Sequence, residues 1–178
     1  SYVGNGAPVL IRKAMGPEAS EAEVKEALNF FLGYYRDHML DHTVLYPGVR
    51  VALDRLHHAD VRMAVLTNKP VRFTKGLVMQ LGLETHFFRV YGGNSFEEKK
   101  PDPVGIYALM GEAGAARERT LMVGDSYVDV LTARNAGAYC AGVTFGFQPD
   151  SLIEHPPDFL CDSMAEVVRH VLGYAANT

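Results

Sequence analysis

Three stretches of the sequence place side chains that can bind phosphate or metal ions after an expected apolar strand. In the first, Thr67 and Asn68 follow the run Val61–Leu66 and offer a hydroxyl and an amide that can both donate to a phosphoryl oxygen. The simpler interpretation makes Thr67 or Asn68 the N-cap of a helix that has Pro70 in its first turn.

The second stretch, residues 97–103, sets two lysines beside two prolines at the start of an expected helix. Proline restricts the backbone and therefore fixes the direction of a neighbouring lysine. Lys100 could thus neutralise a phosphate and hold a carboxylate nucleophile. A solvated run of charges in front of a helix is the alternative.

The third stretch, residues 122–129, is the most specific of the three. Asp125 ends an apolar run and Asp129 lies four residues later, one turn into the next helix, so both carboxylates can face one hard cation. Ligation by oxygen atoms suits Mg²⁺. In the alternative, Asp125 or Ser126 caps the helix and Asp129 is a favourable charge in its first turn.

The elements that must position these side chains alternate between short apolar strands and helices. Strands are expected over residues 61–66, 87–91, 121–123 and 139–143, and helices over residues 71–81, 104–112 and 127–136. Alternation of this kind predicts an α/β fold with a Rossmann-like, doubly wound parallel sheet. Because such sheets bind ligands beyond the carboxyl ends of their strands, the three stretches should meet at one edge and bind a phosphate dianion beside Mg²⁺.

Two capping boxes mark further helices. Ser20 with Glu23 starts an amphipathic helix that should run to about Met39, and Ser163 with Glu166 starts the last helix of the chain.

The composition is that of an ordinary globular chain. With 178 residues, 48% hydrophobic and 21% charged, the chain can form one well-buried domain with a small appendage. The net charge is −4, and the sequence contains no cluster of basic residues. We therefore expect a small phosphorylated metabolite as partner, and neither nucleic acid nor membrane. We expect a cytoplasmic protein, monomeric or homodimeric, with Cys140 and Cys161 as buried, reduced thiols.

Taken in order, the three stretches resemble the second, third and fourth motifs of the haloacid dehalogenase superfamily. The matching segments are Thr67-Asn68-Lys69-Pro70, Lys99-Lys100-Pro101-Asp102-Pro103 and Gly124-Asp125-Ser126-Tyr127-Val128-Asp129. Residues 91–93, 133–137 and 142–147 resemble the phosphoglycolate phosphatase group in particular, and Gly4-Asn5-Gly6-Ala7 is similar to the cap-domain loop of that group.

The resemblance implies a role for each motif residue. Thr67 and Asn68 would hold the phosphoryl oxygens, and Lys100 would steady the nucleophile and the phosphate, which makes Thr67 and Lys100 the catalytic side chains. Asp125 would bind Mg²⁺, and Asp129 would bind the same metal or orient its water.

The resemblance also divides the chain. Residues 1–43 would be part of a helical cap whose Gly4, Asn5 and Gly6 face the substrate, and residues 44–178 would be the α/β core. Lys69 and Ser126 would support the site from within their motifs.

The implied activity is Mg²⁺-dependent hydrolysis of a small phosphate monoester, most closely 2-phosphoglycolate, through an aspartyl-phosphate. A sugar-phosphate mutase of the same superfamily and a catalytically inactive module are the alternatives.

One feature of the superfamily does not occur in this sequence, namely the Asp-x-Asp-Gly-Thr motif that ends the first strand and carries the nucleophile. By the resemblance, that strand lies centrally, between the strands that end near Thr67 and Val123. We therefore expect the nucleophile and its strand to lie outside these 178 residues, and we expect this chain by itself to have no phosphatase turnover.

Overall fold

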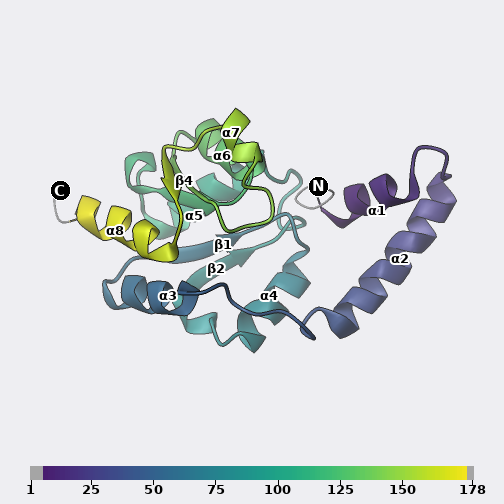
Figure 1. Ribbon diagram of the computed structural model, residues 1–178, viewed down its shortest axis with the longest axis horizontal. Helices are drawn as coiled ribbons and strands as arrows, with labels where there is room; N and C mark the ends of the chain where they lie inside the picture. Colours follow the sequence, from purple (N-terminus) through teal and green to yellow (C-terminus); the bar gives the residue numbers. More distant parts are fainter. Residues whose placement is uncertain (1–5, 176–178) are drawn as a thin grey trace.

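The computed structural model describes residues 6–175, which form an α/β body with a pair of helices projecting from one side (Figure 1). The helices are α1 (Ala7–Met15), α2 (Glu21–His38), α3 (Val49–His58), α4 (Val71–Gln80), α5 (Val104–Ala113), α6 (Tyr127–Ala136), α7 (Ser151–Glu154) and α8 (Met164–Ala175). The strands are β1 (Met63–Leu66), β2 (Phe87–Tyr91), β3 (Leu121–Gly124), β4 (Tyr139–Val143) and β5 (Phe159–Cys161). Single 3₁₀ turns, Glu84–His86 and Arg117–Arg119, precede β2 and β3.

All strand pairs are parallel, and they form two sheets, β1-β2 and β3-β4-β5. The carboxyl ends are aligned within each sheet, because Leu66 pairs with Tyr91 and Gly124 pairs with Gly142. Within residues 6–175, β1 and β3 do not pair with each other. The division falls where the resemblance to the haloacid dehalogenase superfamily implies a further strand.

Helices cover both faces and hold the two sheets together. In Figure 1, α5 and α6 lie on one side of the strands while α3 and α4 lie on the other. The sheets are bridged where α5 contacts α6 and where α3 contacts α8. In the second bridge, Ala52 and Leu56 of α3 pack against the buried Val168 of α8. Burial of a Leu or Val side chain, such as Leu56 or Val168, contributes about 1.5–3 kcal/mol.

The projecting pair, α1 and α2, has little core of its own. Val24 is the one buried residue among residues 6–43. The expected capping box is confirmed, since the Ser20 amide donates to a Glu23 carboxylate oxygen at 2.8 Å and the Glu23 amide donates to Ser20 Oγ at 3.3 Å. The division of the chain at residue 43 stays a prediction.

The parallel α/β fold is confirmed, and α1 is the main element that the sequence pattern missed. Gly6 at its N-cap supplies no side-chain hydrogen bond, and its first turn contains no acidic residue. Pro8 in the first turn is a weaker signal of a helix start, and without a side-chain cap or an acidic first turn it did not identify this helix. Within residues 6–175, no helix has both the length and the apolar character needed to cross a membrane.

Candidate active site

The carboxylate of Asp129 joins the third and fourth motifs. Its Oδ1 accepts a hydrogen bond from Lys100 Nζ at 2.6 Å, and the two side chains are only 7% and 12% exposed. Its Oδ2 accepts from Ser126 Oγ at 2.8 Å and from the amides of Asp125 and Ser126 at 3.2 Å each. Both oxygens are therefore engaged, and the position of the lysine ammonium is fixed.

The same contacts explain the local sequence around β3. Ser126 is the N-cap of α6 and forms a capping box with Asp129, so the helix-capping interpretation holds together with the ion pair. A methyl group added at Gly124 would lie 2.2 Å from Cγ of Asp129, which is closer than any side chain can approach. The glycine leaves space for the carboxylate directly behind the end of the strand.

Asp125 is held by the loop after β4, which lies within residues 142–147 and for which no role in the site was predicted. Its Oδ2 accepts a hydrogen bond from the Phe147 amide at 2.5 Å. A methyl group at Gly146 would lie 2.2 Å from Cβ of Asp125, so this loop closes tightly around the aspartate. The residues of the loop contribute backbone groups, which explains why side-chain chemistry did not identify it.

The loop after β1 brings the second motif against the third. The Thr67 amide donates to the Tyr91 carbonyl at 3.1 Å and extends the pairing of β1 with β2 by one residue. Thr67 Oγ1 accepts from the Lys69 amide at 3.1 Å, and Asn68 Nδ2 donates to the Lys100 carbonyl at 2.9 Å. The amide side chain of Asn68 thus connects the two motifs.

Glycines after β2 allow this loop to lie close to its neighbour. A methyl group on Gly93 would be 2.3 Å from the Asn68 carbonyl oxygen, and one on Gly92 would be 2.3 Å from the Val71 amide nitrogen. Thr67, Asn68 and Lys100 line one small pocket together with these glycines.

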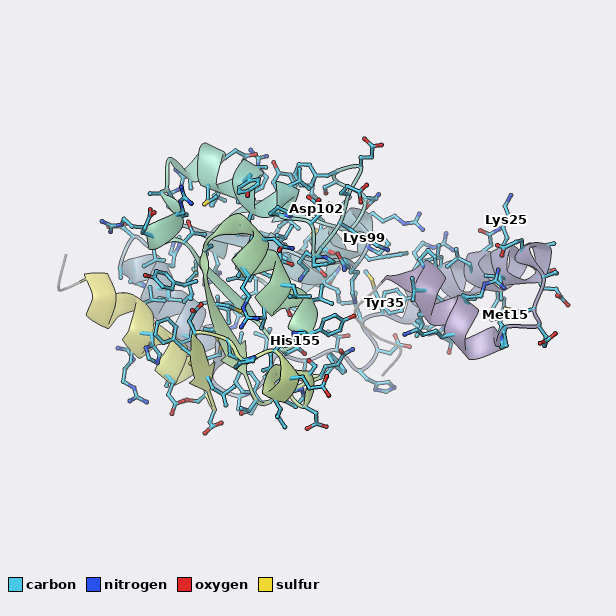
Figure 2. The ribbon with its side chains drawn as sticks, turned by 90° about the horizontal axis from the view of Figure 1, so that it is seen from above. Met15, Lys25, Tyr35, Lys99, Asp102 and His155 are labelled. Atoms are coloured by element: carbon cyan, nitrogen blue, oxygen red, sulfur yellow. The ribbon has the colours of Figure 1, made fainter. Side chains whose placement is uncertain are left out.

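Asn68, Lys100, Asp129 and Asp125 consequently form one chain of hydrogen bonds at the carboxyl ends of β1 and β3. Gly6, directly before α1, lies nearby, since a methyl group at its Cα would be 3.4 Å from Lys99 Nζ. Figure 2 shows Lys99 where the projecting helices meet the core. Gly4 and Asn5 lie outside the described residues.

The donor set of the site suits Mg²⁺ shared with a phosphate. This ion commonly takes one or two protein carboxylates and completes its octahedron with water and phosphate oxygens. Asp125 supplies a carboxylate at the end of β3, held by a single backbone amide through one oxygen. Asp129 fits an orienting role better than a ligand role, because both of its oxygens accept hydrogen bonds from protein groups. Among residues 6–175, no three His, Cys, Asp or Glu side chains are grouped as a metal cage.

Both cysteines are buried, as the sequence predicts. Burial, together with the nearby carboxylates of Asp129 and Asp158, raises the pKa of the Cys140 thiol to about 12. Burial also raises the pKa of Cys161. Because a protonated thiol is a poor nucleophile, neither cysteine is placed to act in catalysis at neutral pH.

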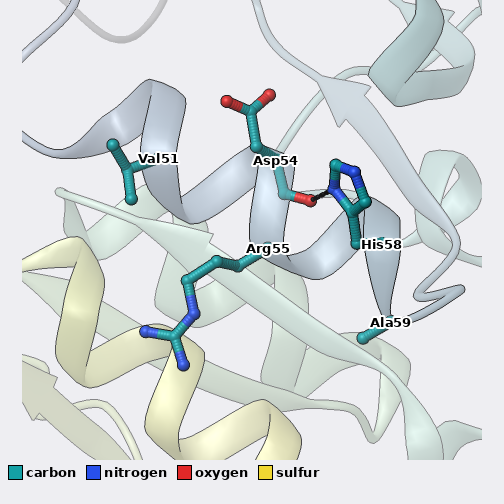
Figure 3. A pocket seen from close by; sticks show the side chains of 5 residues that line it. All are labelled: Val51, Asp54, Arg55, His58 and Ala59. Atoms are coloured by element: carbon teal, nitrogen blue, oxygen red, sulfur yellow. Dashed lines mark hydrogen bonds between the residues drawn. The ribbon is translucent and has the colours of Figure 1, made fainter.

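A separate groove on the outer face of α3 contains none of the motif residues (Figure 3). Its five lining residues follow helical spacing: Val51, Asp54, Arg55, His58 and Ala59. Asp54 Oδ1 lies 2.7 Å from Nε2 of His86, which directly precedes β2. The groove therefore lies toward the amino ends of the strands, away from the motif residues.

The model of the haloacid dehalogenase-like hydrolase family matches residues 3–143 of this chain. The chain belongs to that family. Among curated members, a phosphoglycolate phosphatase of Pseudomonas fluorescens is 38% identical over 98% of this chain and 66% of its own length. One from Vibrio vulnificus is 39% identical over 96% of this chain and 78% of its own length. The chain thus spans between about two thirds and four fifths of these family members.

Solved structures of the family agree with the fold. The structure of a predicted phosphoglycolate phosphatase from Haemophilus somnus superposes with a TM-score of 0.87 at 31% identity, covering 94% of this chain and 78% of the other. The structure of a predicted phosphatase from Clostridium acetobutylicum gives a TM-score of 0.82 at 21% identity, which supports the fold alone.

Proposed function

We propose that this protein is a Mg²⁺-dependent phosphatase that hydrolyses a small phosphate monoester, most closely 2-phosphoglycolate. The observation that carries the proposal is the hydrogen-bonded chain from Asn68 through Lys100 to Asp129, which gathers an amide, a cation and a carboxylate where the carboxyl ends of the two sheets meet. The named activity of the Pseudomonas and Vibrio relatives supports the choice of substrate.

In this proposal, the Thr67 hydroxyl and the side-chain amide of Asn68 bind phosphoryl oxygens. Lys100 Nζ offsets the negative charge that develops on the phosphoryl group during transfer. The ion pair with Asp129 holds the ammonium in place before the substrate arrives, so little reorganisation is needed during the reaction. Asp125 would hold Mg²⁺, with Asp129 as its orienting neighbour. When bound, the cation adds positive charge beside the phosphoryl group.

We further propose that the nucleophilic aspartate belongs to a strand between β1 and β3, from a segment outside the 178 residues. Both strands are parallel to their partners, and within residues 6–175 neither pairs with a strand across the division. A parallel strand there would end beside Thr67 and Asp125. Its carboxylate would attack phosphorus and expel the alcohol, and water would then hydrolyse the aspartyl-phosphate to release phosphate.

The test compares the protein expressed from its complete reading frame with the 178-residue chain. Release of inorganic phosphate from 2-phosphoglycolate is measured with Mg²⁺ and with EDTA. We expect Mg²⁺-dependent release from the complete protein, no release from the 178-residue chain, and a loss of at least about 100-fold in kcat for Lys100→Met. Lys25→Met is the matched control, since Lys25 lies on the far part of the projecting helices (Figure 2).

Equal turnover by both proteins would contradict the placement of the nucleophile. A product that keeps its phosphate on an isomerised substrate, with little free phosphate, would replace the phosphatase by a sugar-phosphate mutase.

A further inference from the structure

The projecting helices meet the core next to the phosphate-binding loop, residues 67–70. Besides Gly6, two residues near the end of α2 lie against the core. Tyr35 contacts Lys69 and Phe73, and the Met39 methyl group lies 2.9 Å from the position of a methyl group added at Gly76. Because residues 6–43 bury so little surface of their own, these contacts have a large share in fixing the position of α2.

The Tyr35 side chain is held on three sides. Its ring packs edge-on against Phe73 at 5.4 Å between centroids and stacks on Phe31 at 5.7 Å. Lys69 Nζ donates a hydrogen bond to the Tyr35 hydroxyl and lies 4.8 Å from the ring centroid. Phe73 is only 3% exposed, so the ring rests on a fixed support. Figure 2 shows Tyr35 at this junction.

The backbone of Lys69 belongs to the site itself. Its amide donates to Thr67 Oγ1 at 3.1 Å, and its carbonyl accepts from the Gly93 amide at 2.9 Å. Any change that orders this loop therefore also orders the base of the Lys69 side chain. One residue thus contacts the proposed phosphate-binding hydroxyl through its backbone and the cap through its ammonium group.

We propose that Tyr35 is a positioning residue that couples helix α2 to the phosphate-binding loop through Lys69. An anion at Thr67 and Asn68 and the docked position of α2 then favour each other, since thermodynamic coupling between two events is reciprocal. The effect on turnover rests on the proposed function, whereas the effect on α2 rests on anion binding alone.

The test uses the protein from the complete reading frame and inorganic phosphate as the ligand, with amide hydrogen exchange read by mass spectrometry over residues 35–46. Phosphate should slow exchange in this segment in the wild type. Tyr35→Phe removes the hydroxyl and keeps the ring, and Lys69→Met removes the ammonium. We expect each substitution to reduce the phosphate-dependent protection by at least about fivefold. Lys69→Arg should retain it.

Tyr34→Phe is the matched control, because Tyr34 is 59% exposed and stacks on His38 within the same helix. It should behave like the wild type. On 2-phosphoglycolate, Tyr35→Phe should raise KM by about fivefold or more while kcat changes less than about twofold, since Tyr35 orients the cap and touches no reacting atom. The double variant Tyr35→Phe with Lys69→Met should be no worse than Lys69→Met alone.

The coupling is wrong if Tyr35→Phe keeps the protection seen with Tyr34→Phe, or if the effects of the two substitutions simply add. The wild-type protein could show phosphate-dependent protection that needs Tyr35 and yet leave 2-phosphoglycolate intact. That result would overturn the proposed substrate and support the coupling. If Tyr35→Phe changes neither hydrolysis of 2-phosphoglycolate nor the phosphate-dependent protection, the proposed substrate is supported and the coupling is overturned.

Discussion

Lys100→Met removes the cation from the ion pair at the centre of the site and keeps most of its apolar volume. The Asp129 side chain is only 7% exposed, and after the substitution its Oδ1 faces the apolar methionine. Its Oδ2 keeps three protein donors. Stability and activity should both fall, for separable reasons.

The magnitude follows from the burial of the pair. Removing one partner of a buried ion pair costs about 3–5 kcal/mol, because the other charge stays buried without compensation. The three donors that remain on Asp129 Oδ2 favour the lower end, so we expect a loss of about 3 kcal/mol. With a urea m value of about 2 kcal/mol per molar, the unfolding midpoint should fall by about 1.5 M.

The assay is urea unfolding followed by circular dichroism, with the complete protein and without ligand. Arg36→Met is the matched control, because the Arg36–Asp37 pair is 62% and 59% exposed and should contribute less than about 1 kcal/mol. In the double variant Lys100→Met with Asp129→Asn, the buried charge is removed, and part of the lost stability should return. A midpoint shift for Lys100→Met no larger than that of Arg36→Met would refute the reasoning.

Three further predictions concern close packing and pH. Gly105→Ala places a methyl group 2.5 Å from Cδ1 of Leu66 and should lower the free energy of unfolding in urea by about 1–3 kcal/mol. Gly111→Ala on the same helix is the control. Its methyl group meets nothing within 4 Å, so it should be neutral or stabilising by up to about 1 kcal/mol. Gly146→Ala should weaken Mg²⁺ activation of turnover at least about tenfold by displacing Asp125, and unchanged activation would contradict the role of that loop. Burial raises the pKa of the Cys140 thiol to about 12 in the folded protein, whereas the pKa of an unfolded cysteine is about 8.5. The unfolded chain therefore loses this proton first as the pH rises. The free energy of unfolding should fall above pH 8.5, by about 2 kcal/mol between pH 8 and 10. Urea unfolding of the wild type and of Cys140→Ala at both pH values checks the direction of this stability change, because the variant should lack it.

The sequence predicted the meeting of Asn68, Lys100, Asp125 and Asp129 because each follows an apolar strand and parallel strands end at one edge. It could not divide the roles of the two aspartates. Four residues of spacing place both carboxylates on one side of a helix start, but the engagement of both oxygens of Asp129 depends also on Lys100, 29 residues away along the chain.

Other features had no local signal to detect. The contact between Tyr35 and Lys69 joins residues 34 positions apart, and neither helical periodicity nor capping pattern encodes it. The loop that holds Asp125 acts through the Phe147 amide, a group that every residue except proline carries. Such contacts depend on tertiary packing and become visible only in the folded chain.

The division between β1 and β3 has a consequence for the order in which this protein assembles. Each sheet contains a local unit, β1-α4-β2 or β3-α6-β4, that can form from contacts close in sequence, which fold fastest. The ion pair of Lys100 with Asp129 forms only when the two units dock through α5 with α6 and α3 with α8. We therefore expect the site between the two sheets to become ordered only after both local units have formed.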